Sequence, residues 1–300
     1  MTQDVKTVDA GVLAVSYLED GPSSGWPAVL SHGFPFDVHA FDEVVRLLTD
    51  QGARVIRPYL RGYGPTRFLS AGTQRSGQQA ALGSDLIALL DALGLSTAVL
   101  AGYDWGGLAS CVAAALWPER VAGLVSLASY DIIDVDRQKH AYEPSLEHIL
   151  WYQHLFQTDR GRECLASYRR ELCRTLWRQW SPTWRFDEVT FARTAASFDN
   201  PDFVDVVIHA YRHGFGLAAG DPAYEELEDR LGRRPRITVP AVTLDGAHDP
   251  LKPGGTADQA GMFTARHEHR VINAGHNLPQ EAPGAFADAV LAVRKWAQQG

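Results

Sequence analysis

The stretch that decides the fold is Ala101-Gly102-Tyr103-Asp104-Trp105-Gly106-Gly107. It follows a short apolar run at 98–100 and precedes a stretch of small residues, 108–116, that is typical of a buried helix. A Gly-x-nucleophile-x-Gly pattern between a strand and a helix indicates a tight turn whose central residue has a strained backbone. The glycines are needed because side chains there would collide with the neighbouring strand and helix. Asp104 stands where serine is usual, so it is either a carboxylate nucleophile or a cap of the following helix.

Short apolar runs alternate with helical patterns toward both ends of the chain. The runs are 28–30, 55–56, 98–100, 124–127, 241–244 and 271–272, and leucines at 82, 86, 89, 90 and 93 recur at helical spacing. Apolar strands that alternate with helices predict an α/β fold, with a mostly parallel sheet flanked by helices.

This alternation stops in the middle of the chain. Residues 131–235 are rich in Trp, Tyr, Arg and His, and their pattern is mostly helical. We therefore expect a helical cap (lid) at 131–235, inserted in a core domain of residues 1–130 and 236–300. Trp177, Trp180 and Trp184 have the spacing of one helix face, but Pro182 argues against a single helix through all three. Core packing is the preferred interpretation of these rings, and lining of a pocket is the alternative.

Composition and charge exclude several classes of protein. The chain has 300 residues, 45% hydrophobic and 21% charged, as in globular enzymes, and its formal net charge of −8 argues against nucleic acid as a partner. Cys111, Cys164 and Cys173 cannot all pair and are not spaced for metal, which indicates a cytoplasmic protein. Met1 to Asp4 do not resemble a signal peptide, and no apolar stretch approaches the ~20 residues of a membrane helix.

Three further motifs follow apolar runs. They are Ser31-His32-Gly33-Phe34-Pro35, Leu244-Asp245-Gly246-Ala247-His248-Asp249, and Gly275-His276-Asn277. The carboxyl ends of parallel strands meet at one edge of a sheet, so these side chains and Asp104 are expected near one another. A carboxylate, an imidazole and a second carboxylate are the groups of a nucleophile, base and acid constellation.

Together these motifs resemble those of the α/β-hydrolase superfamily, and the resemblance covers essentially the whole chain. The chain order in that superfamily is nucleophile, acid, histidine, which implies Asp104, then an acid, then His276. Asp249 is the preferred acid. Asp131, just past an earlier strand, is its rival, and Asp245 is expected to be structural.

The resemblance also implies an oxyanion hole, made by the backbone N–H groups of Phe34 and Trp105. His32 is the competing candidate for the base, but a structural role in the turn is preferred for it. Glu281 is expected to cap the last helix.

An aspartate nucleophile narrows the resemblance to epoxide hydrolases and to haloalkane or haloacid dehalogenases. His-Gly-Phe-Pro with Asp-Trp-Gly-Gly is most similar to the epoxide hydrolase branch. Trp151 to Gln157 and Ala210 to Arg212 resemble the segments that carry the two ring-opening tyrosines, which implies Tyr152 and Tyr211. Two phenols make chemical sense because ring opening creates an alkoxide, which needs O–H donors.

The expected function is therefore hydrolysis of an epoxide to a diol, with a small apolar or amphipathic organic substrate and water, and with no metal or other cofactor. A haloalkane dehalogenase is the alternative, because the indole N–H of Trp105 could donate a hydrogen bond to a leaving halide. However, Phe34 stands where those enzymes usually have the Asn that contacts the halide. A further alternative is a binding or receptor protein that has the hydrolase fold but no catalytic activity. Tyr59 and Tyr103 depart from the family pattern, and formation of a homodimer stays open.

Overall fold

The apolar runs of the sequence form the central strands of one sheet. The structure, a computed structural model, describes residues 4–299, so Met1 to Gln3, on which the prediction of no signal peptide rests, lie outside the described residues. The strands are β1 (Lys6–Ala10), β2 (Leu13–Asp20), β3 (Trp26–Ser31), β4 (Ala53–Pro58), β5 (Arg67–Phe68), β6 (Ala98–Gly102), β7 (Val121–Leu127), β8 (Ala241–Gly246) and β9 (His267–Ile272).

The sheet has nine strands in the order β1-β2-β4-β3-β6-β7-β8-β9, with β5 paired to β2. Every pairing from β4 to β9 is parallel, while β1, β2 and β5 pair antiparallel at one edge. The sequence predicted the parallel strands and not the antiparallel edge. The parallel sheet flanked by helices confirms the predicted fold class.

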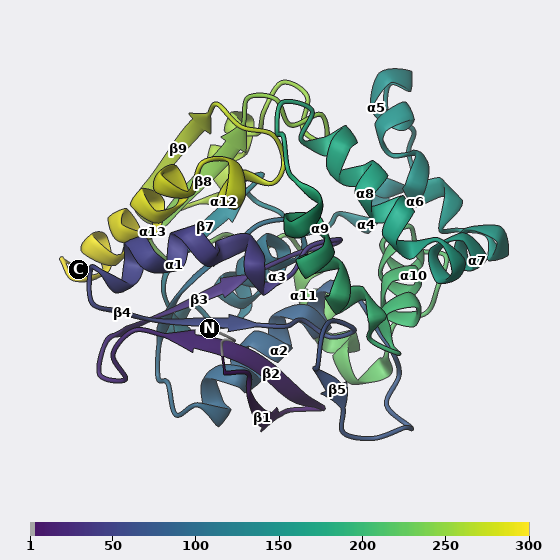
Figure 1. The fold of residues 1–300 in the computed structure, drawn as a ribbon. Helices are drawn as coiled ribbons and strands as arrows, with labels where there is room; N and C mark the ends of the chain where they lie inside the picture. The colour runs from purple at the N-terminus through teal and green to yellow at the C-terminus, as the bar shows by residue number, and fades with distance from the viewer. Residues whose placement is uncertain (1–3, 300) are drawn as a thin grey trace.

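Helices cover both faces of the sheet (Figure 1). On one face α1 (Asp42–Thr49) packs against α13 (Pro283–Ala297), and on the other α2 (Gln79–Ala92) packs against α3 (Trp105–Leu116). The central strands are consequently buried on both sides, as their continuous apolar sequences require.

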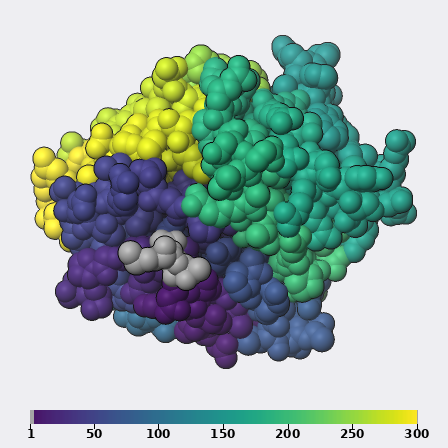
Figure 2. Space-filling view, viewed as in Figure 1, coloured from purple at the N-terminus to yellow at the C-terminus, as the bar shows by residue number. Residues whose placement is uncertain are grey.

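Between β7 and β8 the described chain is built from helices. They are α4 (Val135–Gln138), α5 (Pro144–Ile149), α6 (Trp151–Leu155), α7 (Asp159–Ser167), α8 (Arg169–Trp180), α9 (Glu188–Ala195), α10 (Phe203–Gly214) and α11 (Glu225–Gly232). We call residues 128–240 the helical insertion. It forms the teal and green part of the molecule in Figure 2, beside the purple and yellow core. Among the residues that the structure describes, its contribution to strand pairing is a single bridge between Ile237 and Phe263.

The tryptophan stripe is divided as Pro182 predicted. Helix α8 ends at Trp180, and Trp184 lies beyond it. Trp177 and Trp180 are fully buried, so core packing is correct for both. Trp180 also contacts the ring of His276 edge-on, with 5.4 Å between ring centroids.

No helix within residues 4–299 is both long enough and apolar enough to cross a bilayer.

Candidate active site

Asp104 lies in the turn between β6 and α3, with a backbone that few residues other than glycine adopt. Its φ is 52° and its ψ is −130°. The turn is so tight that a Cβ on Gly106 would lie 1.9 Å from the carbonyl oxygen of Ser31. A Cβ on Gly102 would lie 2.4 Å from the backbone of Gly106. These glycines therefore allow β3, β6 and α3 to converge at the carboxylate.

The two oxygens of Asp104 have different surroundings. Oδ1 accepts hydrogen bonds from the backbone N–H groups of Phe34 and Trp105, both at 2.7 Å. Oδ2 faces Nε2 of His276 at 3.4 Å. Asp104 thus caps α3 through Oδ1, while Oδ2 remains directed at the histidine. The sequence left open whether Asp104 is a helix cap or a nucleophile. The two roles are compatible, since Oδ1 makes the cap and Oδ2 is free of it.

His276 follows β9 and lies between two carboxylates. Its Nδ1 is 2.8 Å from Oδ2 of Asp249, whose Oδ1 accepts from the backbone N–H of Leu251 at 2.9 Å. The backbone N–H of His276 donates to the carbonyl of Trp180 at 3.0 Å, so the helical insertion helps to hold this loop. Asp249, Asp104 and His276 therefore form one connected chain of side chains.

The other acidic candidates have different partners. Asp131 lies near Lys252, with 3.5 Å between Oδ1 and Nζ. Asp245 accepts from the backbone N–H and the hydroxyl of Thr256, at 2.6 and 2.7 Å, and this fits the structural role expected for it. Asp249 is thus the acid whose hydrogen bond orients His276.

Burial and charge act in opposite directions on His276. Burial lowers its pKa, but the carboxylates of Asp249 and Asp104 favour the imidazolium and raise the pKa to about 10. In the ligand-free protein His276 is therefore protonated at neutral pH. Removal of the negative charge of Asp104 would lower this pKa.

His32 and Glu281 have structural contacts. Nδ1 of His32 is 3.1 Å from the carbonyl of Gly33, and Nε2 accepts from the backbone N–H of Leu60 at 3.2 Å. Burial lowers the pKa of His32 to about 4, which keeps the ring neutral. The prediction that Glu281 caps the last helix was wrong. Its carboxylate accepts from the backbone N–H of Gly275 at 2.9 Å, and α13 begins without a side-chain cap.

Tyr152 on α6 and Tyr211 on α10 meet above Phe34. Their rings are nearly perpendicular, with centroids 5.4 Å apart, and each ring also contacts the ring of Phe34. The hydroxyl of Tyr152 accepts a hydrogen bond from Nε2 of Gln153 at 2.9 Å. Burial raises the pKa of both phenols, so both keep their protons at neutral pH.

A single cavity of about 450 Å³ contains these groups. Asp104, Trp105, Tyr152, Tyr211 and His276 all line it. Its remaining walls are part apolar and part polar; the polar members include Asp131, Gln138, Gln153, Lys252 and Gln259. The sequence analysis named Asp104, Trp105, Tyr152, Tyr211 and His276 as candidate site residues. It did not single out Gln153 or Lys252. Their signals were weak, because each is only a polar neighbour of a motif, directly after Tyr152 or three residues after Asp249.

Within residues 4–299 no group of three or more His, Cys, Asp or Glu side chains is arranged to hold a metal ion. The side chains that line the cavity include the carboxylate of Asp104, the imidazole of His276 and the phenols of Tyr152 and Tyr211.

Some known proteins resemble this chain along most of its length and others along part of it. A solved structure from Klebsiella pneumoniae, provisionally assigned as an epoxide hydrolase, is 42% identical and superposes with a TM-score of 0.95 over 97% of each chain. Epoxide hydrolase A of Mycobacterium tuberculosis is 24% identical over 95% of each chain. A haloalkane dehalogenase of Mycolicibacterium paratuberculosis is 35% identical over 41% of this chain and 40% of its own.

The family described as alpha/beta hydrolase fold matches residues 27–283, from β3 to the start of α13. The match includes the turn at Asp104, the loop of Asp249 and the loop of His276. With the parallel sheet and the glycine-lined turn, it identifies the chain as a member of the alpha/beta hydrolase fold family.

Proposed function

We propose that the protein hydrolyses an epoxide to a diol through a covalent alkyl ester on Asp104. The observation that carries this proposal is the pair of protonated phenols, Tyr152 and Tyr211, in the cavity that Asp104 lines. A hydrolase acting on esters through a serine has no use for such a pair, whereas an opening epoxide ring needs proton donors for its oxygen.

In the first step Oδ2 of Asp104 attacks an epoxide carbon. A carbon–oxygen bond of the ring breaks as the ester bond forms, and the ring oxygen takes a proton from Tyr152 or Tyr211. An alkoxide is a stronger base than a phenolate, so this transfer is favourable even though burial raises the pKa of both phenols. The proton of His276 then restores the tyrosine, because the ester has removed the charge that held it.

In the second step neutral His276, oriented by Asp249, takes a proton from water as the water oxygen attacks Cγ of Asp104. The charge that develops on Oδ1 is held by the N–H groups of Phe34 and Trp105, which already bond this atom at 2.7 Å. His276 returns its proton to the departing diol oxygen and then receives the proton of the new carboxylic acid. The starting state, an imidazolium between two carboxylates, is restored.

We further propose that the helical insertion acts as a cap, with boundaries near residues 131 and 235. It contributes Tyr152 and Tyr211 and closes the cavity over the carboxyl ends of the strands, where ligands enter folds of this class. The three unpaired cysteines support the proposed cytoplasmic location.

A haloalkane dehalogenase is the second candidate, since Trp105 lines the cavity beside Asp104. Phe34, however, offers no side-chain donor to a halide, and two phenols have no clear part in its release. The epoxide reaction uses more of the groups that line this cavity.

Replacement of both Tyr152 and Tyr211 by Phe tests the proposal. We expect alkylation of Asp104 by an epoxide to fall by at least ~10²–10³, because the developing alkoxide loses its donors. Single-turnover mass spectrometry of the Asp104 ester measures this rate, and halide release from a bromoalkane is the control. Equal epoxide rates in the two proteins would remove the phenols from the mechanism. Halide release without any epoxide turnover would favour the dehalogenase.

A further inference from the structure

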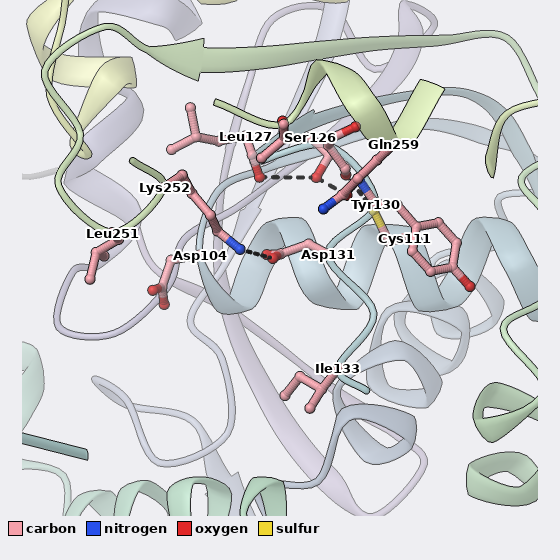
Figure 3. Close-up of polar contacts among 12 residues, drawn as sticks. Asp104, Cys111, Ser126, Leu127, Tyr130, Asp131, Ile133, Leu251, Lys252 and Gln259 are labelled. Atoms are coloured by element: carbon pink, nitrogen blue, oxygen red, sulfur yellow. Dashed lines mark hydrogen bonds and ion pairs between the residues drawn. The ribbon is translucent and has the colours of Figure 1, made fainter. Parts of the chain in front are cut away.

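An acidic and a basic side chain line the cavity and have no part in the proposed mechanism. Asp131 follows β7 and Lys252 follows β8, and these strands are adjacent in the sheet. Figure 3 shows the ammonium of Lys252 directed at the Asp131 carboxylate. Both residues line the cavity that contains Asp104 and His276. The pair is therefore within the space that a substrate of Asp104 occupies.

The pair keeps unused hydrogen-bonding capacity. Nζ of Lys252 and Oδ1 of Asp131 are 3.5 Å apart, which is long for a charged hydrogen bond. An ammonium has three N–H donors, and within residues 4–299 this contact is the one hydrogen bond of the Lys252 side chain. The side chains of Lys252 and Asp131 are 38% and 18% exposed. A group placed between them could accept from one and donate to the other.

The loop that carries Asp131 has an uncommon backbone conformation at two consecutive residues. Ala128 and Ser129 both have positive φ, 69° and 61°, which is uncommon for residues other than glycine. The loop is held in place by Tyr130, whose backbone N–H donates to Gln259 at 3.0 Å and whose hydroxyl donates to the carbonyl of Pro235 at 2.8 Å. Such strain persists where the surroundings over-determine it, and it is concentrated at functional sites. Asp131 follows this segment closely in the chain and lines the cavity.

The charges around the cavity decide which group fits. At the pair itself an anionic substituent would face the carboxyl group of Asp131, and a cationic substituent would face the ammonium of Lys252, so neither sign suits both groups. A hydroxyl is neutral, accepts from Lys252 and donates to Asp131, and so satisfies both partners at once.

We propose that Lys252 and Asp131 form a polar subsite for a hydroxyl group of the substrate, so that the preferred epoxides are amphipathic and hydroxylated. This inference rests on the proposed epoxide hydrolase function and names the substrate class of the same site. The apolar members of the lining, which include Leu108, Leu146, Leu150 and Phe215, would hold the hydrocarbon between the epoxide and the hydroxyl.

The experiment compares terminal epoxides that carry a hydroxyl at the far end with parent alkyl epoxides of matching chain length. For at least one chain length, kcat/KM in the wild type should be about tenfold higher for the hydroxylated member. Lys252→Met removes the charge and keeps the length of the side chain, and it should bring this ratio close to one. Lys295→Met, at an exposed position of α13, is the matched control and should keep the wild-type ratio.

Asp131→Asn gives an independent readout. It removes the like charge and leaves Lys252 without its carboxylate partner, so the ratio for an epoxide with a terminal carboxylate over its parent should rise about tenfold or more.

Three results would overturn the inference. The first is a ratio that stays the same in Lys252→Met, including the case in which hydroxylated and parent epoxides slow equally, as they would if Lys252 acted only through nearby Asp249. The second is a wild type that prefers the carboxylate series. The third is a wild type that turns over no epoxide, which would overturn the proposed function as well. If the wild type turns over the parent epoxides but Lys252→Met leaves the ratio of hydroxylated to parent epoxide unchanged, the subsite is wrong and the proposed function stands.

Discussion

His276 is the residue whose environment says most about the chemistry. It is buried, yet two carboxylates within 3.4 Å favour its charged form, and its pKa rises to about 10. In the proposed cycle His276 gives this proton to the tyrosine once the ester has formed, and it is then neutral and can act as the base of the second step. Formation of the ester removes the charge of Asp104, so the same event that calls for a base lowers the pKa of His276.

Asp104→Asn should lower the pKa of His276, because it replaces a charged carboxylate with a neutral amide of nearly the same shape. NMR titration of the histidines measures this pKa. Stability gives a second readout. The folded pKa of about 10 lies above the ordinary 6.5, so protonation stabilises the fold fully below pH 6.5, and this contribution is lost as the pH rises toward 10. The variant should lose less stability than the wild type over that range. Identical titrations in the two proteins would contradict this electrostatic account.

His276→Gln should separate the two half-reactions. Asp104 can still attack the epoxide, but water has no base, so a covalent adduct should accumulate on Asp104 and turnover should fall by at least ~10². Intact-protein mass spectrometry detects the adduct, and His276→Gln combined with Asp104→Asn is the control that should carry none. Substrate consumption without any adduct would count against the covalent scheme.

The turn between β6 and α3 carries Asp104, and the loop after β3 packs closely against it. A Cβ on Gly33 would lie 2.3 Å from Oδ1 and 2.4 Å from Cβ of Asp104. The loop after β3 can therefore bring the N–H of Phe34 to the carboxylate only if residue 33 has no side chain. The proposed oxyanion hole thus depends on two separate elements meeting at one glycine.

Gly33→Ala should displace the carboxylate from the Phe34 N–H and reduce alkylation of Asp104 by ~10² or more, because small errors of position at a reacting atom are costly. Gly284→Ala in α13 is the matched control. A Cβ there meets nothing within 4 Å, so it should leave activity unchanged and stabilise the helix by up to ~1 kcal/mol. Rates of ester formation and thermal unfolding measure the two effects. A Gly33→Ala protein with normal alkylation would show that the carboxylate has room that the structure does not give it.

At the scale of the whole molecule, the helical insertion is tied to the core by buried polar contacts. The carboxylate of Asp37, which is 1% exposed, accepts from Thr194 at 3.0 Å and from Ser197 at 2.7 Å. The indole of Trp177 donates to the carbonyl of Pro35 at 2.8 Å. These bonds lie next to the loop of Phe34, so the position of the insertion and the geometry of the proposed oxyanion hole are linked.

Ser197→Ala should destabilise the protein by about 1.5–3 kcal/mol, because a buried carboxylate loses a donor. Ser24→Ala, at an exposed turn, is the control and should stay within ~0.5 kcal/mol of the wild type. Denaturant unfolding measures both. If the two variants proved equally stable, the bond between Ser197 and Asp37 would have no part in holding the insertion.

The sequence by itself determined the fold class and the chain order of the site. Both follow from local patterns: buried parallel strands are continuous apolar runs, and the turn at Asp104 can close only with glycines around it. Each of these patterns is visible within a few consecutive residues, because a buried strand needs a short apolar run and a strained turn needs glycines beside it. The antiparallel edge of β1, β2 and β5 and the role of Glu281 were not determined in this way, since each depends on a distant partner.

Only the tertiary structure decided which groups share the cavity. The sequence could not choose firmly between Asp131 and Asp249, because both follow parallel strands and both can reach the same edge of the sheet. The choice came from geometry: Asp249 is 2.8 Å from His276, whereas Asp131 faces Lys252. The meeting of Tyr152 with Tyr211 is decided in the same way, because side chains 59 positions apart come together only through the packing of α6 and α10 against the core. Hydrogen bonds and charges act over a few ångströms in space, and separation along the chain does not report that distance.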